Sequence, residues 1–130
     1  MSGNAWVAIG AVLASAAVAA GAIGTHVLKE TIKLEAPALE TFETAVRYQM
    51  YHALGLILVG LLILRQPHGL LTLAGAAFLF GIVLFSGGIY AWLATAQRPF
   101  IMVVPIGGSA WILGWLVFAA GVIASAAKRG

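Results

Sequence analysis

The stretch ETFETAVRYQMYHALGLILVGLLIL, residues 40–64, decides the fold of this chain. Its first half carries charged and polar side chains, whereas its second half is an unbroken apolar run. At about 100° per residue of α-helix, the polar side chains fall within an arc of roughly 140°, and apolar side chains lie opposite. We therefore expect a helix with one face toward protein and the other toward lipid. The polar arc comprises Thr44, Arg47, Tyr48, Tyr51, His52 and Gly55, and the expected lipid face comprises Phe42, Val46, Met50, Ala53 and Ile57.

The composition of the whole chain is that of a membrane protein. Of its 130 residues, 62% are hydrophobic and only 8% are charged, whereas soluble domains carry about 25% charged residues. A water-soluble fold would have too few polar side chains to cover its surface. We predict an all-α, integral membrane bundle of four transmembrane helices in a single domain, residues 1–130, with helices at about 5–28, 38–64, 70–95 and 101–126.

The segments outside residues 40–64 carry their own signals. The Ala-rich first segment has small residues at the spacing of a signal-peptide cleavage site, but it lacks a basic leading region and is too long, so a membrane span is favoured. Residues 29–39 are expected to form the longest polar connection, with Pro37 in the first turn of the next helix. Small residues recur on one face of each remaining helix and allow close helix contact. The glycines expected at helix contacts are Gly21, Gly24, Gly81, Gly88, Gly107, Gly108 and Gly114.

The tryptophans fall into two groups by their position in the helices. Trp111 and Trp115 lie deep within the last segment, so their indole N–H groups need acceptors inside the bundle. Trp6 and Trp92 lie near helix ends and fit the interfacial belt.

The sequence lacks the residues that several classes of function need. The chain has no cysteine, which excludes disulfides, thiolate metal sites and cysteine nucleophiles. The net charge of +3 comes from seven basic residues scattered among loops and ends, so we expect no nucleic-acid partner. Glycine loops for phosphate, nucleophile elbows and helical zinc motifs are missing. We expect no enzymatic activity, no metal and no cofactor.

Polar side chains at membrane depth are the candidate site. Counting back from Arg65, His52 lies about 20 Å along the helix, within a hydrocarbon layer about 30 Å thick, and Arg47 lies near its far edge. Such groups must face the bundle interior, a watery cavity or one another. We predict a polar pocket near one membrane surface. Its candidate residues are Arg47, Tyr48, Gln49, Tyr51, His52, Ser86 and Tyr90, with His26 at the rim.

Each ionisable candidate has two possible roles. Arg47 can bind an anionic group such as a lipid phosphate, or it can pair with Glu43 one turn earlier. His52 can relay protons or bind a ligand, or it can be a neutral imidazole hydrogen-bonded within the bundle. Haem ligation between His26 and His52 is a further alternative, but no second pair or carboxylate supports it. The three tyrosines are favoured as members of a hydrogen-bond network rather than as catalysts.

Four motifs carry a resemblance to a known family. They are GAIGTHVL at 21–28, FETAVRYQMYHALGLILVG at 42–60, LFSGGIY at 84–90 and PIGGSAWILGW at 105–115. They resemble the YgdD-like family of small uncharacterised membrane proteins of bacteria, with relatives in mitochondria. The resemblance implies a four-helix inner-membrane protein and brings no activity with it. The chain departs from the usual family pattern at Ile23, Thr25 and Gly88, and the last position commonly carries a hydroxyl.

These observations favour a non-enzymatic membrane protein. We expect an accessory subunit, or a binder of a small ligand or lipid with a polar pocket around Arg47 and His52. The alternative is a small transporter or channel that uses the same two residues, and the third hypothesis is a haem- or quinone-linked redox subunit. The expected partners are membrane lipids and further copies of the chain or a larger membrane complex. We expect the bacterial cell (inner) membrane, with both termini in the cytoplasm, because Glu30 and Glu35 offset the basic residues of the long loop.

Overall fold

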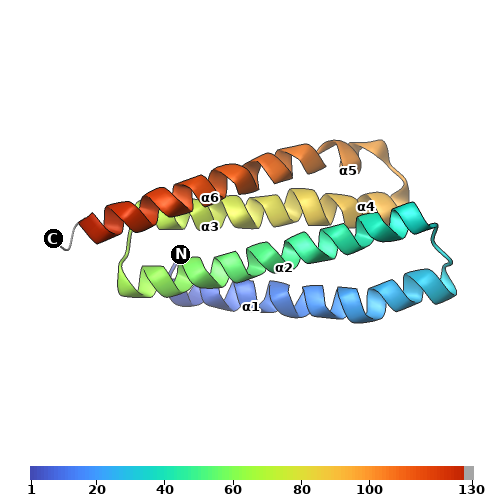
Figure 1. The fold of residues 1–130 in the computed structure, drawn as a ribbon, viewed down its shortest axis with the longest axis horizontal. Coiled ribbons are helices and arrows are strands. Elements are labelled where there is room, and N and C mark those ends of the chain that lie inside the picture. The colour runs from blue at the N-terminus through green and yellow to red at the C-terminus, as the bar shows by residue number, and fades with distance from the viewer. Residues whose placement is uncertain (128–130) are drawn as a thin grey trace.

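The computed structural model describes residues 1–127 and arranges four helical stretches side by side as an antiparallel bundle (Figure 1). The stretches run over Gly3–Thr31, Ala36–Arg65, Gly69–Thr95 and Arg98–Ala127, and each is long and apolar enough to cross a membrane. Only helices connected by short turns occur in this described range. The predicted all-α bundle of four transmembrane helices is confirmed.

The first two stretches meet at a short connection. Helix α1 (Gly3–Ala19) continues through two π-helical turns, η1 (Ala20–Gly24) and η2 (Val27–Thr31), before α2 (Ala36–Arg65) begins. The helical backbone therefore extends past residue 29, and the polar connection is shorter than expected. Pro37 lies in the first turn of α2 as predicted, where its missing N–H costs no hydrogen bond.

The other two stretches contain one bulge and one break. Helix α3 (Gly69–Gly81) passes through the π-helical turn η3 (Ile82–Ser86) into α4 (Gly87–Thr95). The short helix α5 (Arg98–Met102) is separated from α6 (Val104–Ala127) at Val103. Pro105 explains this break, because its ring would clash with the carbonyl four residues earlier in a continuous helix.

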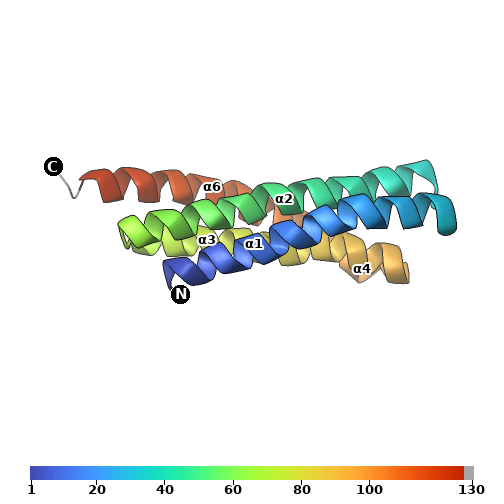
Figure 2. The same cartoon turned by 90° about the horizontal axis from the view of Figure 1, so that it is seen from below.

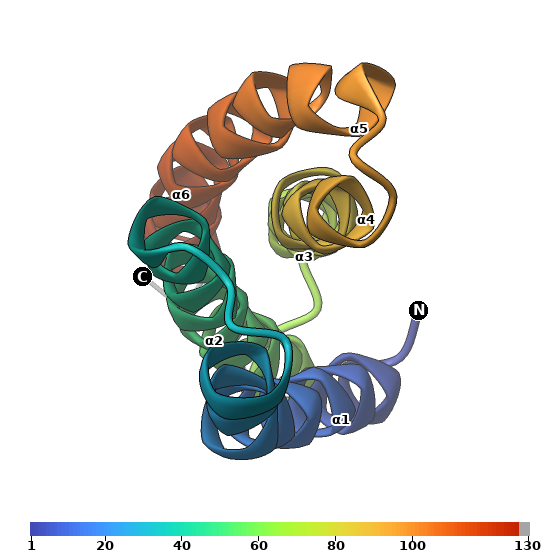
Figure 3. The ribbon, with the colours of Figure 1, turned by 90° about the vertical axis from the view of Figure 1, so that its right-hand side faces the viewer.

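The helices pack through glycines. A Cβ atom at Gly10 of α1 would lie 2.7 Å from the Ala53 carbonyl oxygen of α2, and one at Gly107 of α6 would lie 2.6 Å from the Phe85 backbone nitrogen. Backbones can come this close only without side chains, so these positions hold α1 against α2 and α6 against the α3–η3 stretch. Figure 3 shows α2 between α1 on one side and α3 with α6 on the other.

Both ends of the described chain lie at one end of the bundle. The start of α1, the α2–α3 turn and the last turns of α6 lie together there, and the other two connections lie at the opposite end (Figures 1 and 2). Helix α2 has 30 residues, a length of about 45 Å, which exceeds a hydrocarbon layer of about 30 Å. The polar start of α2 can therefore lie at the membrane surface.

The core contains a tryptophan that the sequence placed at the membrane interface. Trp6 is only 3% exposed and belongs to the apolar core with Phe78. Its ring packs where a Cβ at Gly75 would lie 3.1 Å away, so the absence of a side chain on α3 makes room for it. The prediction of an interfacial role for Trp6 was wrong, because nothing in the sequence indicates which helix lies opposite.

Candidate functional site

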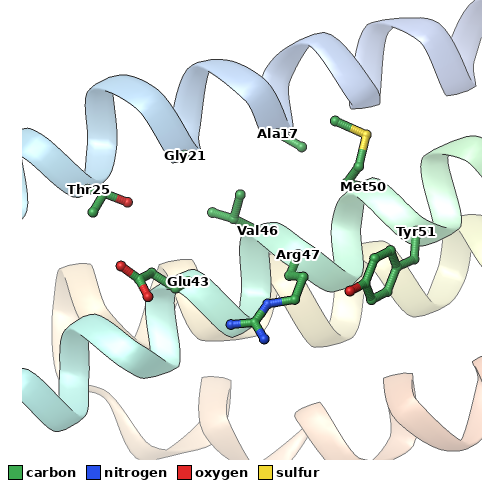
Figure 4. Close-up of a pocket in the computed structure, with 8 residues that line it drawn as sticks. All are labelled: Ala17, Gly21, Thr25, Glu43, Val46, Arg47, Met50 and Tyr51. Carbon is green, nitrogen blue, oxygen red and sulfur yellow. The ribbon is translucent and has the colours of Figure 1, made fainter.

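Helix α2 packs against other helices both on its predicted polar face and on its predicted lipid face. Ala53, expected to face lipid, is fully buried, and its carbonyl oxygen lies against Gly10 of α1. Val46 and Met50 point toward α1 in Figure 4. The expected lipid face is therefore a helix-packing face, and that prediction was wrong at these positions. The reason is that α1 offers α2 an apolar surface, as lipid would.

The exposed side of α2 is a narrow strip between its two packed faces. Leu54 is 49% exposed and Leu58 is 48% exposed, and Tyr51 continues this strip at 51%. Arg47 is also exposed. We call the part formed by Arg47 and Tyr51 the α2 ridge. The predicted polar arc thus divides between this ridge and the bundle interior.

Gln49 joins three helical stretches by hydrogen bonds. Its Nε2 donates to the Leu13 carbonyl oxygen of α1 at 2.9 Å, and the Tyr90 hydroxyl of α4 donates to its Oε1 at 2.9 Å. Nearby, the fully buried Ser86 donates from Oγ to the Ala45 carbonyl oxygen at 2.8 Å. These polar groups are satisfied within the protein, as apolar surroundings require. They fix α1, α2 and the η3–α4 segment in register.

His52 has a partner for each ring nitrogen. The Trp115 indole donates from Nε1 to His52 Nε2 at 3.1 Å, and His52 Nδ1 lies 2.8 Å from the Tyr48 carbonyl oxygen. Because an indole N–H can only donate, Nε2 carries no proton and Nδ1 is the donor to the carbonyl. The imidazole is therefore neutral. The ring also stacks on Trp111, with centroids 3.8 Å apart and planes at 4°.

Both deep tryptophans find acceptors. Trp111 donates from Nε1 to the Phe78 carbonyl oxygen of α3 at 3.1 Å, and Trp115 donates to His52. The prediction that these indoles need acceptors inside the bundle is confirmed. Together with His52 they connect α6 to α2 and α3.

A groove runs along one side of the ridge. It lies between residues 17–25 and residues 43–51, and its volume is about 480 Å³. We call it the α1–α2 groove. Ala17 and Gly21 line it on the α1 side, while Glu43 and Arg47 provide its charges (Figure 4). No ion pair joins the Glu43 carboxylate to the Arg47 guanidinium among the described residues, and Tyr51 lies beside the arginine (Figure 4).

A second hollow lies on the other side of the ridge. It runs between residues 44–52 of α2 and residues 108–115 of α6, and its volume is about 660 Å³. We call it the aromatic cleft. Its walls include Tyr48, Tyr51 and Trp115, which are 41%, 51% and 39% exposed, and His52 lies at its base. Tyr51 lines both hollows.

The structure divides the predicted site residues among three places. Gln49, Ser86 and Tyr90 form internal hydrogen bonds, and Tyr48 and His52 lie at the aromatic cleft. Arg47 and Tyr51 form the ridge, which separates this cleft from the α1–α2 groove. His26 is exposed on the first stretch. Within residues 1–127, no cluster of three or more His, Asp or Glu side chains could hold a metal ion.

Sequence reasoning did not assign Phe85, Trp111 and Trp115 to a site. The two tryptophans are four residues apart on one face of a helix, and their depth in the sequence predicts only that they need acceptors. That spacing next to Gly108 was the available signal for an aromatic wall, since the glycine leaves room beside the rings.

The glycines singled out from sequence occupy two kinds of surroundings. A Cβ at Gly24 would meet the Phe42 ring at 2.8 Å and one at Gly88 would meet the Phe100 carbonyl oxygen at 2.8 Å. At Gly21 and Gly108 it would make ordinary contacts, with Val46 at 3.4 Å and with Phe85 at 3.7 Å. Close helix contacts also occur at Gly81, Gly107 and Gly114.

Comparison with known proteins places these features in a family. The profile of the family described as "Protein of unknown function (DUF423)" matches residues 20–108. The chain belongs to this family. The match covers the ridge, Gln49, His52, Ser86 and Tyr90, and it ends before Trp111 and Trp115.

Relatives of this DUF423 protein are named as membrane proteins. A UPF0382 membrane protein of Staphylococcus epidermidis is 40% identical over 112 residues, which is 86% of this chain and 89% of the relative. The UPF0382 membrane protein YwdK of Bacillus subtilis is 38% identical over 113 residues, covering 86% and 90% of the two chains. The UPF0382 inner membrane protein YgdD of Escherichia coli is 30% identical over 106 residues, covering 82% and 79%. No solved structure matches the chain.

The resemblance to YgdD expected from the four motifs is therefore confirmed. With four membrane-spanning helices and relatives of this kind, the DUF423 protein is a multi-pass membrane protein.

Proposed function

We propose that this DUF423 protein is a non-enzymatic protein that binds a phosphate-bearing amphiphile, with the phosphate on Arg47 and the apolar part in the α1–α2 groove. The observation that carries the proposal is an exposed arginine without an ion-pair partner among the described residues, beside a groove of about 480 Å³.

The depth of Arg47 favours a headgroup as its partner. Arg47 lies 18 residues before Arg65, or about 27 Å along α2, so it lies close to the edge of a hydrocarbon layer about 30 Å thick. A guanidinium group there is stabilised by extending to the membrane surface or by an anion. Its planar fork suits phosphate, which the interface supplies.

The α1–α2 groove supplies shape rather than most of the binding energy. An acyl chain that enters the groove comes from the apolar interior of the membrane and not from water. Its transfer therefore gains mainly packing contacts. The floor at Ala17 and Gly21 carries only one methyl group, which leaves this space open. The phosphate contact is therefore the principal source of affinity, and the groove selects for a molecule with an apolar tail.

A non-enzymatic role is supported by the state of the buried polar groups. Gln49, His52, Ser86 and Tyr90 all form hydrogen bonds within the bundle. Chemistry or ion passage at these groups would require breaking contacts that join helices.

The proposal includes the cell (inner) membrane, with the start of α1 and the α2–α3 turn in the cytoplasm. All four acidic residues of the chain, Glu30, Glu35, Glu40 and Glu43, precede the middle of α2 and lie toward the end of the bundle that holds the α1–α2 connection. Arg65 lies at the opposite end without acidic neighbours in sequence. We take the Arg65 end as cytoplasmic because Lys29 and Lys33 of the other end stand beside Glu30 and Glu35, whereas the charge of Arg65 is not offset.

Native mass spectrometry of the protein in a mild detergent, with graded additions of phosphatidylglycerol, tests the binding. Arg47→Gln should weaken lipid binding by about 10- to 100-fold, since hydrogen bonds to a charged group contribute about 1.5–3 kcal/mol. Arg65→Gln removes the same charge at the far end of α2 and should leave binding unchanged. Equal binding by the wild type and Arg47→Gln would refute the proposal. Inorganic phosphate added alone should not compete, and competition would indicate a site for the free anion instead.

A further inference from the structure

The α2 ridge has a hollow on each side. Val46 and Met50 border it in the α1–α2 groove, while Tyr48 and His52 border it in the aromatic cleft. Arg47 is exposed on α2 and lines the groove beside Tyr51 (Figure 4), and Tyr51 lines both hollows. One cation thus lies beside the residue that the two hollows share.

The two hollows cover the same depth of the membrane. One is bordered by residues 43–51 of α2 and the other by residues 44–52, so each extends about 12 Å along the helix. The outer end of each is polar, with Glu43 and Thr25 in the groove and Thr44 in the cleft. Each then continues toward apolar and aromatic side chains nearer the centre of the bundle. Their volumes, about 480 and 660 Å³, both lie within the range of ligand pockets.

The ridge offers a second donor beside the arginine. The Tyr51 hydroxyl makes no hydrogen bond within the described residues, and it lies on the Arg47 side of the ring (Figure 4). A guanidinium and a hydroxyl side by side suit one phosphate group. By contrast, the hollow between α3 and α6, lined by Leu73, Phe80 and Val117, is entirely apolar and has no such donor nearby.

We infer that the ligand is a phospholipid with two acyl chains seated across α2, with its phosphate on Arg47 and Tyr51 and one chain in each hollow. This inference rests on the proposed function and adds the class of lipid. A single-chain lipid would fill one hollow and leave the other to unrelated molecules, whereas two chains joined at one headgroup match two hollows that flank one cation.

Two glycines allow each hollow to be filled separately. Gly21 lines the α1–α2 groove and Gly108 lines the aromatic cleft, and a Cβ at either position makes only ordinary contacts. Gly21→Leu and Gly108→Leu should therefore fold while their side chains occupy the hollows. Gly69→Leu at the start of α3 is the matched control, because nothing lies within 4 Å of a Cβ there.

The experiment compares dioleoyl-phosphatidylglycerol with the lyso lipid that has the same headgroup and one oleoyl chain. By native mass spectrometry, the wild type and Gly69→Leu should prefer the two-chain lipid by about three- to tenfold, an effect of chain packing rather than of transfer from water. Gly21→Leu and Gly108→Leu should each abolish that preference and retain binding of the lyso lipid. Should either leucine variant fail to fold, Met50→Trp fills the groove and Ile112→Trp fills the cleft.

The outcomes separate this inference from the proposed function. Equal binding of the two lipids by the wild type, or an unchanged preference in Gly108→Leu, would overturn the two-chain arrangement while Arg47→Gln still weakened binding of both lipids. If Arg47→Gln bound both lipids as well as the wild type, the phosphate site itself would be refuted, and the inference with it.

Discussion

The indole N–H of Trp115 donates to Nε2 of His52 across 3.1 Å and joins α6 to α2. The same imidazole stacks on Trp111 with its plane within 4° of the indole plane. These contacts hold the ring from its edge and from its face, so His52 is oriented by α6 although it belongs to α2. The histidine thus acts as a fixed connection between two helices at the base of the aromatic cleft.

Removing the donor of this bond should loosen that connection. Trp115→Phe keeps an aromatic ring in the cleft but leaves His52 Nε2 without its partner, and we expect a loss of about 0.6–1.7 kcal/mol, the size measured for hydrogen bonds between membrane helices. Reversible unfolding in SDS measures it. Trp92→Phe, near the end of α4, removes an indole that has no bond to another helix within residues 1–127 and should cost less. Equal losses in the two variants would contradict the role of the bond.

Gln49 and Tyr90 should be energetically coupled, because the tyrosine hydroxyl donates to the glutamine side chain at 2.9 Å. Gln49→Leu keeps the approximate shape and removes the bonds to both Leu13 and Tyr90. A double-mutant cycle with Tyr90→Phe should give a coupling of about 0.5–1.5 kcal/mol in the free energy of unfolding. Strictly additive losses would show that the two groups do not interact in the folded protein.

The sequence predicts those features that depend on the length of an apolar segment or on the chemistry of a single residue. Four apolar segments give the four spans, Pro37 gives the start of α2, and the depth of Trp111 and Trp115 gives their need for acceptors. Each of these follows from one segment considered alone. No knowledge of a neighbouring helix is required.

What the sequence could not predict depends on which helices are neighbours. Ala53 looks the same whether lipid or α1 lies against it, and only the structure shows Gly10 there. Gln49 and Arg47 are two residues apart, yet one bonds across the interior and the other lies exposed beside a groove. Trp6 occupies the core because Gly75 lies opposite. In a single sequence, the apolar residues of a membrane helix say little about which other helix they contact.

Close contact of α1 with α2 should make Gly10 intolerant of any side chain. In Gly10→Ala, the added methyl would lie 2.7 Å from the Ala53 carbonyl oxygen, so the two helices must separate, at a cost of about 1–3 kcal/mol. The free energy of unfolding in SDS is the measurement, with Gly69→Ala as the control, since a Cβ there meets open space. A Gly10→Ala protein as stable as that control would mean that the helices are farther apart than the structure has them.

The end of α4 contains a residue in the left-handed region, and glycine should stabilise it. Ala96 has φ of 56° as the C-cap of α4, a conformation that costs an L-residue roughly 1–2 kcal/mol and glycine almost nothing. After the entropy that glycine gains in the unfolded chain, Ala96→Gly should add about 0.5 kcal/mol of stability. Ala120→Gly, in the interior of α6, should instead destabilise by about 0.5–1 kcal/mol. Thermal unfolding should thus shift in opposite directions, and a shift in the same direction for both would exclude the left-handed cap.

The proposed orientation can be tested with single cysteines, because the chain has none of its own. Asn4 is exposed in the first turn of α1 and Gln97 is exposed in the turn before α5, so the two residues lie at opposite ends of the bundle. If the start of α1 and the α2–α3 turn lie in the cytoplasm, a membrane-impermeant maleimide should label Gln97→Cys in intact spheroplasts. It should label Asn4→Cys only after lysis. This result would agree with the proposed placement of Arg65, whose positive charge favours the cytoplasmic side. The reverse pattern would place the α2 ridge in the cytoplasmic leaflet, and the phospholipid bound there would then be drawn from that leaflet instead of the outer one.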